Sequence, residues 1–273
     1  MLFRSRWRIV LFDQRGAGRS LPQGGLQAND TPHLIADMER LRLHLGIANW
    51  MVFGGSWGAT LALAFAQCHP QRVSAMVLRG VFTATAAEAA WLYGADGAAR
   101  RLPAAWQALA DAANLQPGQD LLAAMQAQLS AADSKGLRAA RAWWRWEQDL
   151  IDAEGPGLPP APARPPLDDA AVLASARIGV HYARQGWFLA EGQLLRQAHR
   201  IAGVPGFIVQ GLRDLVTPPD AAQTLHRSWP SAQWRGVPTA GHSSSDPAIA
   251  FELITATHAL NPEARAHETE DKP

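Results

Sequence analysis

The fold of this chain is decided by one stretch, WMVFGGSWGATLALAFAQ, which covers residues 50–67. A short apolar run leads into a glycine-rich turn around Ser56 and then into an alanine- and leucine-rich run, a pattern typical of strand, sharp turn and helix. In this context G-x-S-x-G predicts a serine whose hydroxyl is held above a sheet by a strained backbone conformation. Gly54, Gly55 and Gly58 flank the serine and have no side chains that would obstruct so tight a turn.

The helix after this turn adds an electrostatic argument. It is predicted to begin at Trp57, so its unpaired N–H groups and positive dipole end would point at whatever is attached to Ser56. Negative charge that develops there would be stabilised, and the backbone N–H of Trp57 is the predicted oxyanion donor. The pattern therefore indicates a nucleophile, and the alternative is a turn that only lets a strand and a helix pack closely.

Strand and helix patterns alternate on both sides of this turn. Apolar runs that end in glycine or polar turns predict buried strands at 8–12, 73–78, 206–211 and 233–237. An apolar stripe predicts a helix that Thr31 caps and that ends at about residue 45, and a second helix is predicted at 247–259. Strands separated by helices pair in parallel through right-handed crossovers, so the predicted fold class is α/β, with a doubly wound, mostly parallel sheet.

Residues 84–200 interrupt this alternation. They are rich in alanine, tryptophan and helix formers, show no strand pattern, and contain the densest aromatic cluster of the chain, WWRWE at 143–147. The proline-rich stretch 154–166 is predicted to be an extended connector. A helical insertion after a sheet strand normally covers the carboxyl edge of the sheet, where ligands bind. We therefore predict a core formed by 1–83 and 201–273, with a helical cap at 84–200.

Composition and charge exclude several classes of function. The 25 basic and 24 acidic residues give a formal net charge of +1, so no overall field would attract nucleic acid or an anionic membrane. The single cysteine, Cys68, cannot form an internal disulfide and is typical of a reducing compartment. The apolar run at 9–12 is too short for a signal-peptide core or a membrane span. We expect a soluble, cytoplasmic protein without metal or cofactor, because its histidines and cysteine lack metal-ligand spacing.

Two further polar residues complete a chemical pattern around Ser56. A serine hydroxyl is nearly inert at neutral pH, so it needs a base within hydrogen-bond reach and an acceptor that orients the base. Asp214 and His242 each follow a predicted strand, which places them at the same sheet edge as Ser56. Taken singly, Asp214 could be a turn former and His242 a loop histidine. The chain order Ser, Asp, His favours a catalytic triad of the α/β-hydrolase kind.

At this point the chain resembles a known family. Several of its short sequence motifs are similar to those of the prolyl iminopeptidases, which are α/β-hydrolase serine peptidases that release an N-terminal proline from peptides. The similarity extends over nearly the whole chain and implies Ser56 as nucleophile, His242 as general base and Asp214 as the residue that orients the base. The matching strings are DQRGAGRS (13–20), GGSWG (54–58), LRGVF (78–82), W-x-x-W-E (143–147) and AGHS (240–243).

The resemblance also implies a substrate pocket beneath the cap. Phe82 and the tryptophan cluster with Trp146 would hold the proline ring, Glu147 would pair with the free ammonium group, and Arg79 is a further expected substrate-binding residue. A buried carboxylate facing an amine would make the enzyme an exopeptidase, because substrates without the charge would leave it unpaired. The expected partner is a small peptide with a free N-terminal proline, with no nucleic acid and no membrane.

Two departures from the family pattern bear on the expected activity. Gly179 stands where family members have a second cap glutamate, which favours an esterase or amidase instead. The family's H-G-G-P-G loop, which supplies a second oxyanion donor after an upstream strand, has no counterpart in the sequence. Losing one such donor costs about 10²- to 10³-fold in turnover. We expect an N-terminally shortened enzyme that lacks the N-terminal strands, the missing strand lying between those at 8–12 and 50–53.

Three hypotheses therefore remain open from the sequence. The first is a serine aminopeptidase of the prolyl iminopeptidase type that acts through an acyl-enzyme. The second is an esterase or amidase with the same triad. The third is a non-catalytic remnant that binds a ligand or partner through its cap. The oligomeric state does not follow from the sequence.

Overall fold

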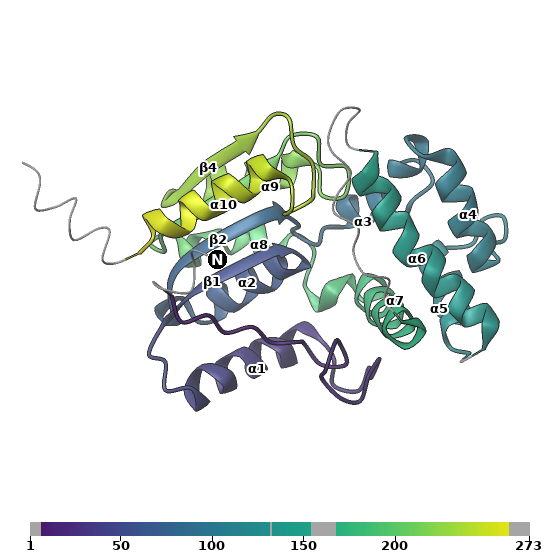
Figure 1. Ribbon diagram of the computed structural model, residues 1–273, viewed down its shortest axis with the longest axis horizontal. Coiled ribbons are helices and arrows are strands. Elements are labelled where there is room, and N and C mark those ends of the chain that lie inside the picture. Colours follow the sequence, from purple (N-terminus) through teal and green to yellow (C-terminus); the bar gives the residue numbers. More distant parts are fainter. Residues whose placement is uncertain (1–6, 132, 154–167, 262–273) are drawn as a thin grey trace, which may run out of the picture.

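The computed structural model describes residues 7–131, 133–153 and 168–261 (Figure 1). Four strands form one sheet in which all described ladders are parallel, which confirms the α/β class. The strand predicted at 206–211 has the expected bounds, and the strand predicted at 73–78 continues for three more residues. In spatial order, the strands are β1 (Trp50–Ser56), β2 (Val73–Val81), β3 (Gly206–Gly211) and β4 (Ala232–Val237).

Helices cover both faces of this sheet (Figure 1). Strand β2 shows the division, because Ala75 and Val77 pack with one helix, α10, while Met76 and Leu78 join the larger apolar cluster with α2. A strand buried on both faces reads as a near-continuous apolar run, as β2 does. One side carries α10 (Pro247–Ala259), and the other carries α1 (Thr31–His44), α2 (Trp57–Cys68), the turn η2 (Pro70–Arg72), α8 (Gln193–Arg196) and α9 (Pro219–Ser228).

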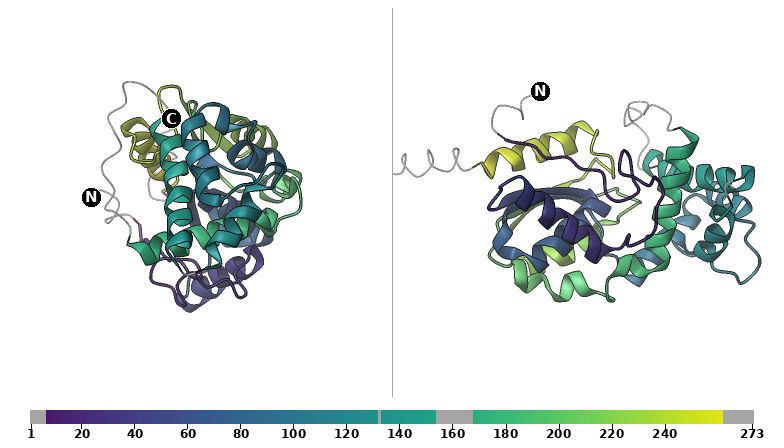
Figure 2. Two further views of the ribbon diagram at one scale, coloured as in Figure 1. Left: turned by 90° about the vertical axis from the view of Figure 1, so that its right-hand side faces the viewer. Right: turned by 90° about the horizontal axis from the view of Figure 1, so that it is seen from below.

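The predicted helical insertion lies beside the sheet, beyond the end of β2 (Figures 1 and 2). The described part of 84–200 contains no strand, and helices α4 to α7 pack on one another. The insertion comprises α3 (Ala86–Tyr93), η3 (Ala98–Arg100), α4 (Pro103–Ala113), α5 (Leu121–Leu129), α6 (Ser134–Asp152), α7 (Asp169–Arg184) and η4 (Gly186–Phe188).

The far end of the insertion packs differently from the rest. Helix α8 and the turn η5 (Ala198–Ile201) contact α2, and Gln67 of α2 donates a hydrogen bond from Nε2 to the carbonyl of Leu194 over 2.7 Å. We therefore propose that the cap is shorter than 84–200 and ends at about Phe188, with the following residues belonging to the core.

The strand predicted at 8–12 is not formed. Residues 7–14 have no described ladder partner, and Ile9 and Leu11 are 53% and 88% exposed. Within the described residues β1 is an edge strand that pairs only with β2. An apolar run becomes a strand only where a neighbour satisfies its backbone and covers its side chains, and the described residues provide no such neighbour at 8–12.

The loop after this segment is nevertheless well anchored. Asp13 accepts a hydrogen bond from the backbone N–H of Arg19 over 3.0 Å, and the Ser20 hydroxyl donates to the carbonyl of Asp13 over 2.8 Å. Arg15 forms a bidentate ion pair with Asp37 of α1, with N–O distances of 2.5 and 2.9 Å. The loop is thus held against α1, and its residues Gln14, Ala17 and Gly18 also line a cavity beneath the insertion.

Within the described ranges, no helix is long and apolar enough to cross a membrane. The connector predicted at 154–166 and the tail from residue 262 onward lie outside the described residues.

Candidate active site

The turn between β1 and α2 has the strained geometry that its sequence predicts. Ser56 has φ of 56° and ψ of −125°, a left-handed conformation that non-glycine residues rarely adopt. A Cβ on Gly54 would overlap the carbonyl of Gly58, and a Cβ on Gly55 would lie 2.5 Å from the guanidinium of Arg79. The predicted role of Gly58 is wrong, because a Cβ there would meet nothing within 4 Å. Gly54 is therefore required by the backbone of the turn, whereas the nearest atoms to a Cβ on Gly55 belong to the end of the Arg79 side chain.

Asp214 and His242 form a buried, hydrogen-bonded pair. The two residues are 2% and 4% exposed, and Nδ1 of His242 lies 2.8 Å from Oδ2 of Asp214. A carboxylate can only accept, so Nδ1 carries the proton, and Nε2 of the neutral ring is then the acceptor. This is the tautomer that a general base needs in order to take a proton from a serine hydroxyl.

The carboxylate of Asp214 is saturated with donors. Its Oδ1 accepts from the backbone N–H groups of Val216 and Thr217, over 2.9 and 2.7 Å. Its Oδ2 accepts from the Thr217 hydroxyl over 2.8 Å and from Gln210 Nε2 over 3.2 Å, in addition to His242. Hydrogen bonds of this number leave the carboxylate one orientation.

Parallel strands explain how residues so distant in sequence come to one edge. Ser56 ends β1, Asp214 follows β3 by three residues, and His242 follows β4 by five. The carboxyl ends of parallel strands lie at the same edge of the sheet, and this edge of open α/β sheets is where ligands bind. At the same edge α2 begins with Trp57, whose backbone N–H belongs to the unpaired first turn of the helix and adjoins Ser56.

A cavity of about 410 Å³ connects this edge with the cap. It contains Ser56 and Trp57 at the turn and is otherwise mostly apolar and aromatic. Its walls come from the loop after residue 13, from the end of β2 and from helices α3, α6 and α7. The lining side chains include Gln14, Gln23, Phe82, Leu92, Tyr93, Trp143, Trp146, Glu147, Leu150, Ile178, Tyr182, Trp187, Val216 and Thr217.

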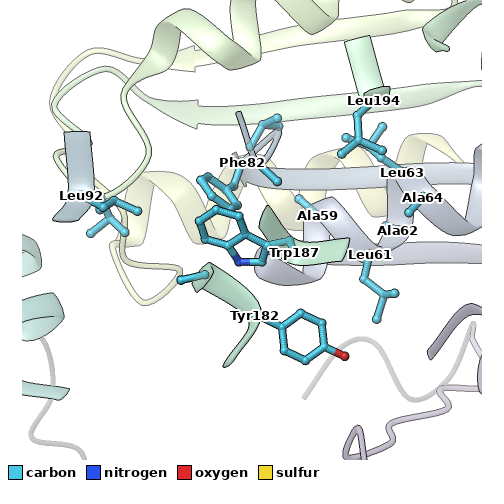
Figure 3. Packing of buried hydrophobic residues seen from close by; sticks show 14 of the residues in the cluster. Ala59, Leu61, Ala62, Leu63, Ala64, Phe82, Leu92, Tyr182, Trp187 and Leu194 are labelled. Carbon is cyan, nitrogen blue, oxygen red and sulfur yellow. The ribbon is translucent and has the colours of Figure 1, made fainter. Parts of the chain in front are cut away.

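The aromatic walls are fixed by ring-to-ring packing. Tyr93 stacks on Trp143 with centroids 4.8 Å apart and an interplanar angle of 16°, and Phe82 meets Trp187 edge-on at 4.7 Å. Figure 3 shows Phe82 and Trp187 in this contact, with Tyr182 further along the same wall. Trp146 is 2% exposed and donates from Nε1 to the carbonyl of Leu92 over 3.0 Å. Such packing produces a rigid apolar slot.

Glu147 is the one described cavity-lining residue whose side chain is charged at neutral pH. The prediction of a buried carboxylate at this position is wrong, because Glu147 is exposed even though it borders the cavity. Burial and then the nearby charge of Glu147 raise the pKa of Tyr93, so this phenol stays protonated. A cationic ligand would find its counter-charge at the open side of the aromatic slot.

The structure thus brings together most of the residues that the sequence singles out. Ser56, Trp57, Phe82, Trp146 and Glu147 all line the cavity, and Asp214 and His242 are paired next to it. Gly179 also lines the cavity, and a Cβ there would lie 3.1 Å from Nε1 of Trp143.

Arg79 is placed elsewhere. It does not belong to the described cavity lining, and its Nη1 donates to the backbone carbonyl of His242 over 2.7 Å. Among the lining residues that were not foreseen from the sequence are three on the insertion, Tyr93, Tyr182 and Trp187. No local motif marks them, and they reach the cavity only because the insertion folds back over the sheet. Among the described residues no group of three or more histidine, cysteine or carboxylate side chains is arranged to hold a metal.

Comparisons with known proteins identify the family of the chain. The family model for the alpha/beta hydrolase fold matches residues 2–247. Proline iminopeptidase of Xylella fastidiosa (strain Temecula1) is 44% identical over 92% of this chain and 80% of its own length. Proline iminopeptidase of Neisseria gonorrhoeae is 41% identical over 94% of this chain and 81% of its own.

Solved structures agree at the level of the fold. An esterase from Rhodococcus sp. ECU1013 superposes with a TM-score of 0.57 at 17% identity, covering 92% of this chain and 78% of that one. A hydrolase of the α/β fold from Bacillus anthracis gives 0.54 at 17%, covering 90% and 79%. With a strained serine turn, a buried Asp–His pair and a capped cavity at one sheet edge, this chain belongs to the proline iminopeptidase family of the α/β-hydrolases.

Proposed function

We propose that this chain is a serine aminopeptidase that releases an N-terminal proline from small peptides. The observation that supports this most directly is a cavity in which a serine on a strained turn shares the described lining with aromatic side chains and one carboxylate, Glu147. The relatives named above are proline iminopeptidases, and the same activity is the simplest one for this cavity.

The proposed reaction proceeds through an acyl-enzyme. The Ser56 hydroxyl attacks the carbonyl carbon of the first peptide bond while Nε2 of His242 takes its proton, and the oxyanion is bound by the backbone N–H of Trp57. The imidazolium then gives that proton to the departing peptide amine, leaving a prolyl ester on Ser56. Water, deprotonated by His242, hydrolyses the ester and frees proline. Asp214 keeps Nδ1 protonated in every step.

Recognition of the substrate would be divided between shape and charge. The proline ring would pack in the slot formed by Phe82, Trp146 and Trp187, where its apolar carbons leave water. The secondary ammonium of an N-terminal proline would pair with Glu147. A peptide with further residues before the proline would carry no charge at that point, so it would leave Glu147 unpaired and would bind more weakly.

A pair of substrates tests this proposal. We expect proline p-nitroanilide to be cleaved with a kcat/KM well above that of N-acetylproline p-nitroanilide, which has the same leaving group and no positive charge. Ser56→Ala is the control for contaminating activity, because it should abolish both reactions. Equal or faster cleavage of the acetylated substrate would contradict the exopeptidase proposal.

One observation favours a second candidate, an esterase or amidase. Gly179 leaves Glu147 as the one described carboxylate at the cavity, and Glu147 is exposed, so selection for a cation is weaker than two buried carboxylates would provide. Faster hydrolysis of p-nitrophenyl esters than of prolyl amides by wild type would support it. A non-catalytic remnant would show no Ser56-dependent labelling by a fluorophosphonate probe, whereas either hydrolase would show it.

We further propose a cytoplasmic location and a small peptide as the partner. The supporting features are the single cysteine and the near-neutral charge, which suit a reducing compartment and a small ligand better than a polyanion.

A further inference from the structure

The last three residues of β2 each contact the His242–Asp214 pair or a residue that holds it. Arg79 donates from Nη1 to the carbonyl of His242 over 2.7 Å. Gly80 lies against the imidazole ring, and Val81 donates its backbone N–H to Gln210, which in turn reaches Asp214. These residues lie within the LRGVF string, and Arg79, Gly80 and Val81 lie outside the described cavity lining. Their position at one strand end, outside the described cavity lining, therefore calls for an explanation other than substrate contact.

Gly80 makes the closest approach to the base. It has φ of +54° and sits at an irregularity of the β1–β2 ladder, where Gly55 pairs with Arg79 but Ser56 pairs with Val81. A Cβ at this position would lie 3.0 Å from Cε1 and 3.1 Å from Nδ1 of His242. A bulge with a left-handed glycine is a device that re-aims a strand end beside an active site. Here it brings bare backbone against one side of the imidazole.

Gln210 connects the same strand end to the carboxylate. It is fully buried in β3, where its Oε1 accepts from the N–H of Val81 over 3.0 Å. A backbone N–H only donates, so the amide has one possible orientation and directs Nε2 the other way. That nitrogen lies 3.0 Å from the carbonyl of Thr217 and 3.2 Å from Oδ2 of Asp214. The described β2–β3 ladder ends at Arg79 and Val209, so this side chain continues it.

We propose that the end of β2 is a template for the catalytic pair, with Arg79, Gly80 and Gln210 as positioning residues that set His242 and Asp214 relative to Ser56. Loops after β3 and β4 carry the two side chains, but loops alone are poor at fixing a geometry to fractions of an ångström. The neighbouring strand, which also pairs with Ser56 through Val81, supplies the common reference. The proposal rests on the proposed function only in taking these residues as the triad.

Two substitutions with matched controls test the template. Gly80→Ala should displace the imidazole, whereas Gly46→Ala adds the same methyl at φ of +66° with nothing within 4 Å. Gln210→Met should remove the hydrogen bond from the Gln210 amide to Asp214. Its control, Gln67→Met, removes an equally buried amide that donates to the carbonyl of Leu194, remote from the His242–Asp214 pair. We expect the rate of fluorophosphonate labelling of Ser56 to fall about 100-fold in Gly80→Ala, since misplacement by about 1 Å can cost that much, and about tenfold in Gln210→Met.

A spectroscopic measurement separates positioning from general loss of stability. The Nδ1 proton of His242, shared with Asp214, should give a low-field proton resonance that His242→Ala removes. Gly80→Ala and Gln210→Met should shift or broaden this resonance. Both controls should keep it unchanged while their melting temperatures fall by about as much as those of the two test variants.

If the two variants lose no more labelling rate than their controls and the resonance is unchanged, the template proposal is wrong. An unreactive wild type would refute the proposed function, and the resonance would still decide whether the strand end sets the pair.

Discussion

The two sides of the active site are built by different means. On the core side, Asp214 accepts from five donors and is fully enclosed. On the cap side, Glu147 is exposed and has no described hydrogen-bond partner, and the surrounding rings are placed by packing. The chemical step needs atoms fixed to fractions of an ångström, which directional bonds provide. Recognition of a ring needs only a slot of the right width, which stacked aromatics provide.

The difference predicts that changes on the core side act on turnover. Ser56→Ala should have the largest effect, a loss of about 10⁶-fold in kcat, because it removes the nucleophile itself. Steady-state hydrolysis of proline p-nitroanilide measures this, with the exposed Ser228→Ala in α9 as the control. A residual rate above about 1% of wild type would mean that another group attacks the substrate.

Asp214→Asn should come next. The amide is isosteric, but it can present an N–H to Nδ1 of His242 and so favour the wrong tautomer, which costs about 10⁴-fold in kcat in triads of this type. KM should change little, since Asp214 does not line the cavity. Asp220→Asn, in the first turn of α9, is the matched control. A rise in KM with unchanged kcat would place Asp214 in substrate binding instead.

A change on the cap side should act on binding. Glu147→Gln should lower kcat/KM for proline p-nitroanilide about tenfold, equivalent to about 1.4 kcal/mol, mainly through KM. The effect is modest because the carboxylate is exposed and its pairing with the ammonium is partly screened. The acetylated substrate should be unaffected, and Asp152→Asn on the same helix serves as the control. An equal loss of kcat/KM for both substrates would show that Glu147 does not recognise the positive charge of the substrate.

The smallest expected effect concerns the loop that borders the cavity on the core side. The hydrogen bond from Arg15, opposed by partial burial, holds the pKa of Asp37 below its ordinary value of 3.8. A carboxyl whose pKa is lower in the folded state than in the unfolded state stabilises the fold at pH values above the unfolded-state pKa. This stabilisation is lost as the pH falls through the folded-state pKa. Asp37→Asn should therefore cost about 1 kcal/mol at pH 7, with the difference from wild type vanishing at strongly acid pH.

Denaturant unfolding at several pH values measures this difference. Asp111→Asn in the cap helix α4 is the control, because its carboxylate contacts only a neighbouring glutamine within the described residues. A difference between wild type and Asp37→Asn that persists undiminished below the folded pKa would show that the ion pair is not its source.

Local pattern was a reliable guide where one element could be judged alone. The helix at 247–259, the strand at 206–211 and the serine turn were predicted with their bounds or geometry, because periodicity and glycine placement act over a few residues. The start of α1 shows the limit of such signals. Thr31 was the predicted cap, but Asp30 caps the helix by accepting from the N–H of His33, while the Thr31 hydroxyl donates to the carbonyl of Trp187. The Thr31 hydroxyl therefore bonds to a segment distant in sequence instead of capping its own helix.

Prediction failed where the outcome depended on neighbours. Residues 8–12 have the composition of a strand, yet no described strand lies beside them, and Leu11 remains 88% exposed. Glu147 was expected to be buried and Arg79 to contact the substrate, but burial and reach depend on how the cap and the strand end are placed. Glu147 lies at the open side of the cavity, and Arg79 holds the loop of His242.

The sequence by itself determined the α/β class, the strained turn at Ser56, the order Ser, Asp, His and the family, because each depends on local spacing or on strings of residues. Only the tertiary structure decided which groups hold the triad and which rings form the slot. The end of β2 meets His242 across 162 positions of chain, from Gly80 to His242, and Gln210 reaches Asp214 from inside a strand. Contacts of that separation follow from parallel strand pairing and cap placement, which no local pattern encodes.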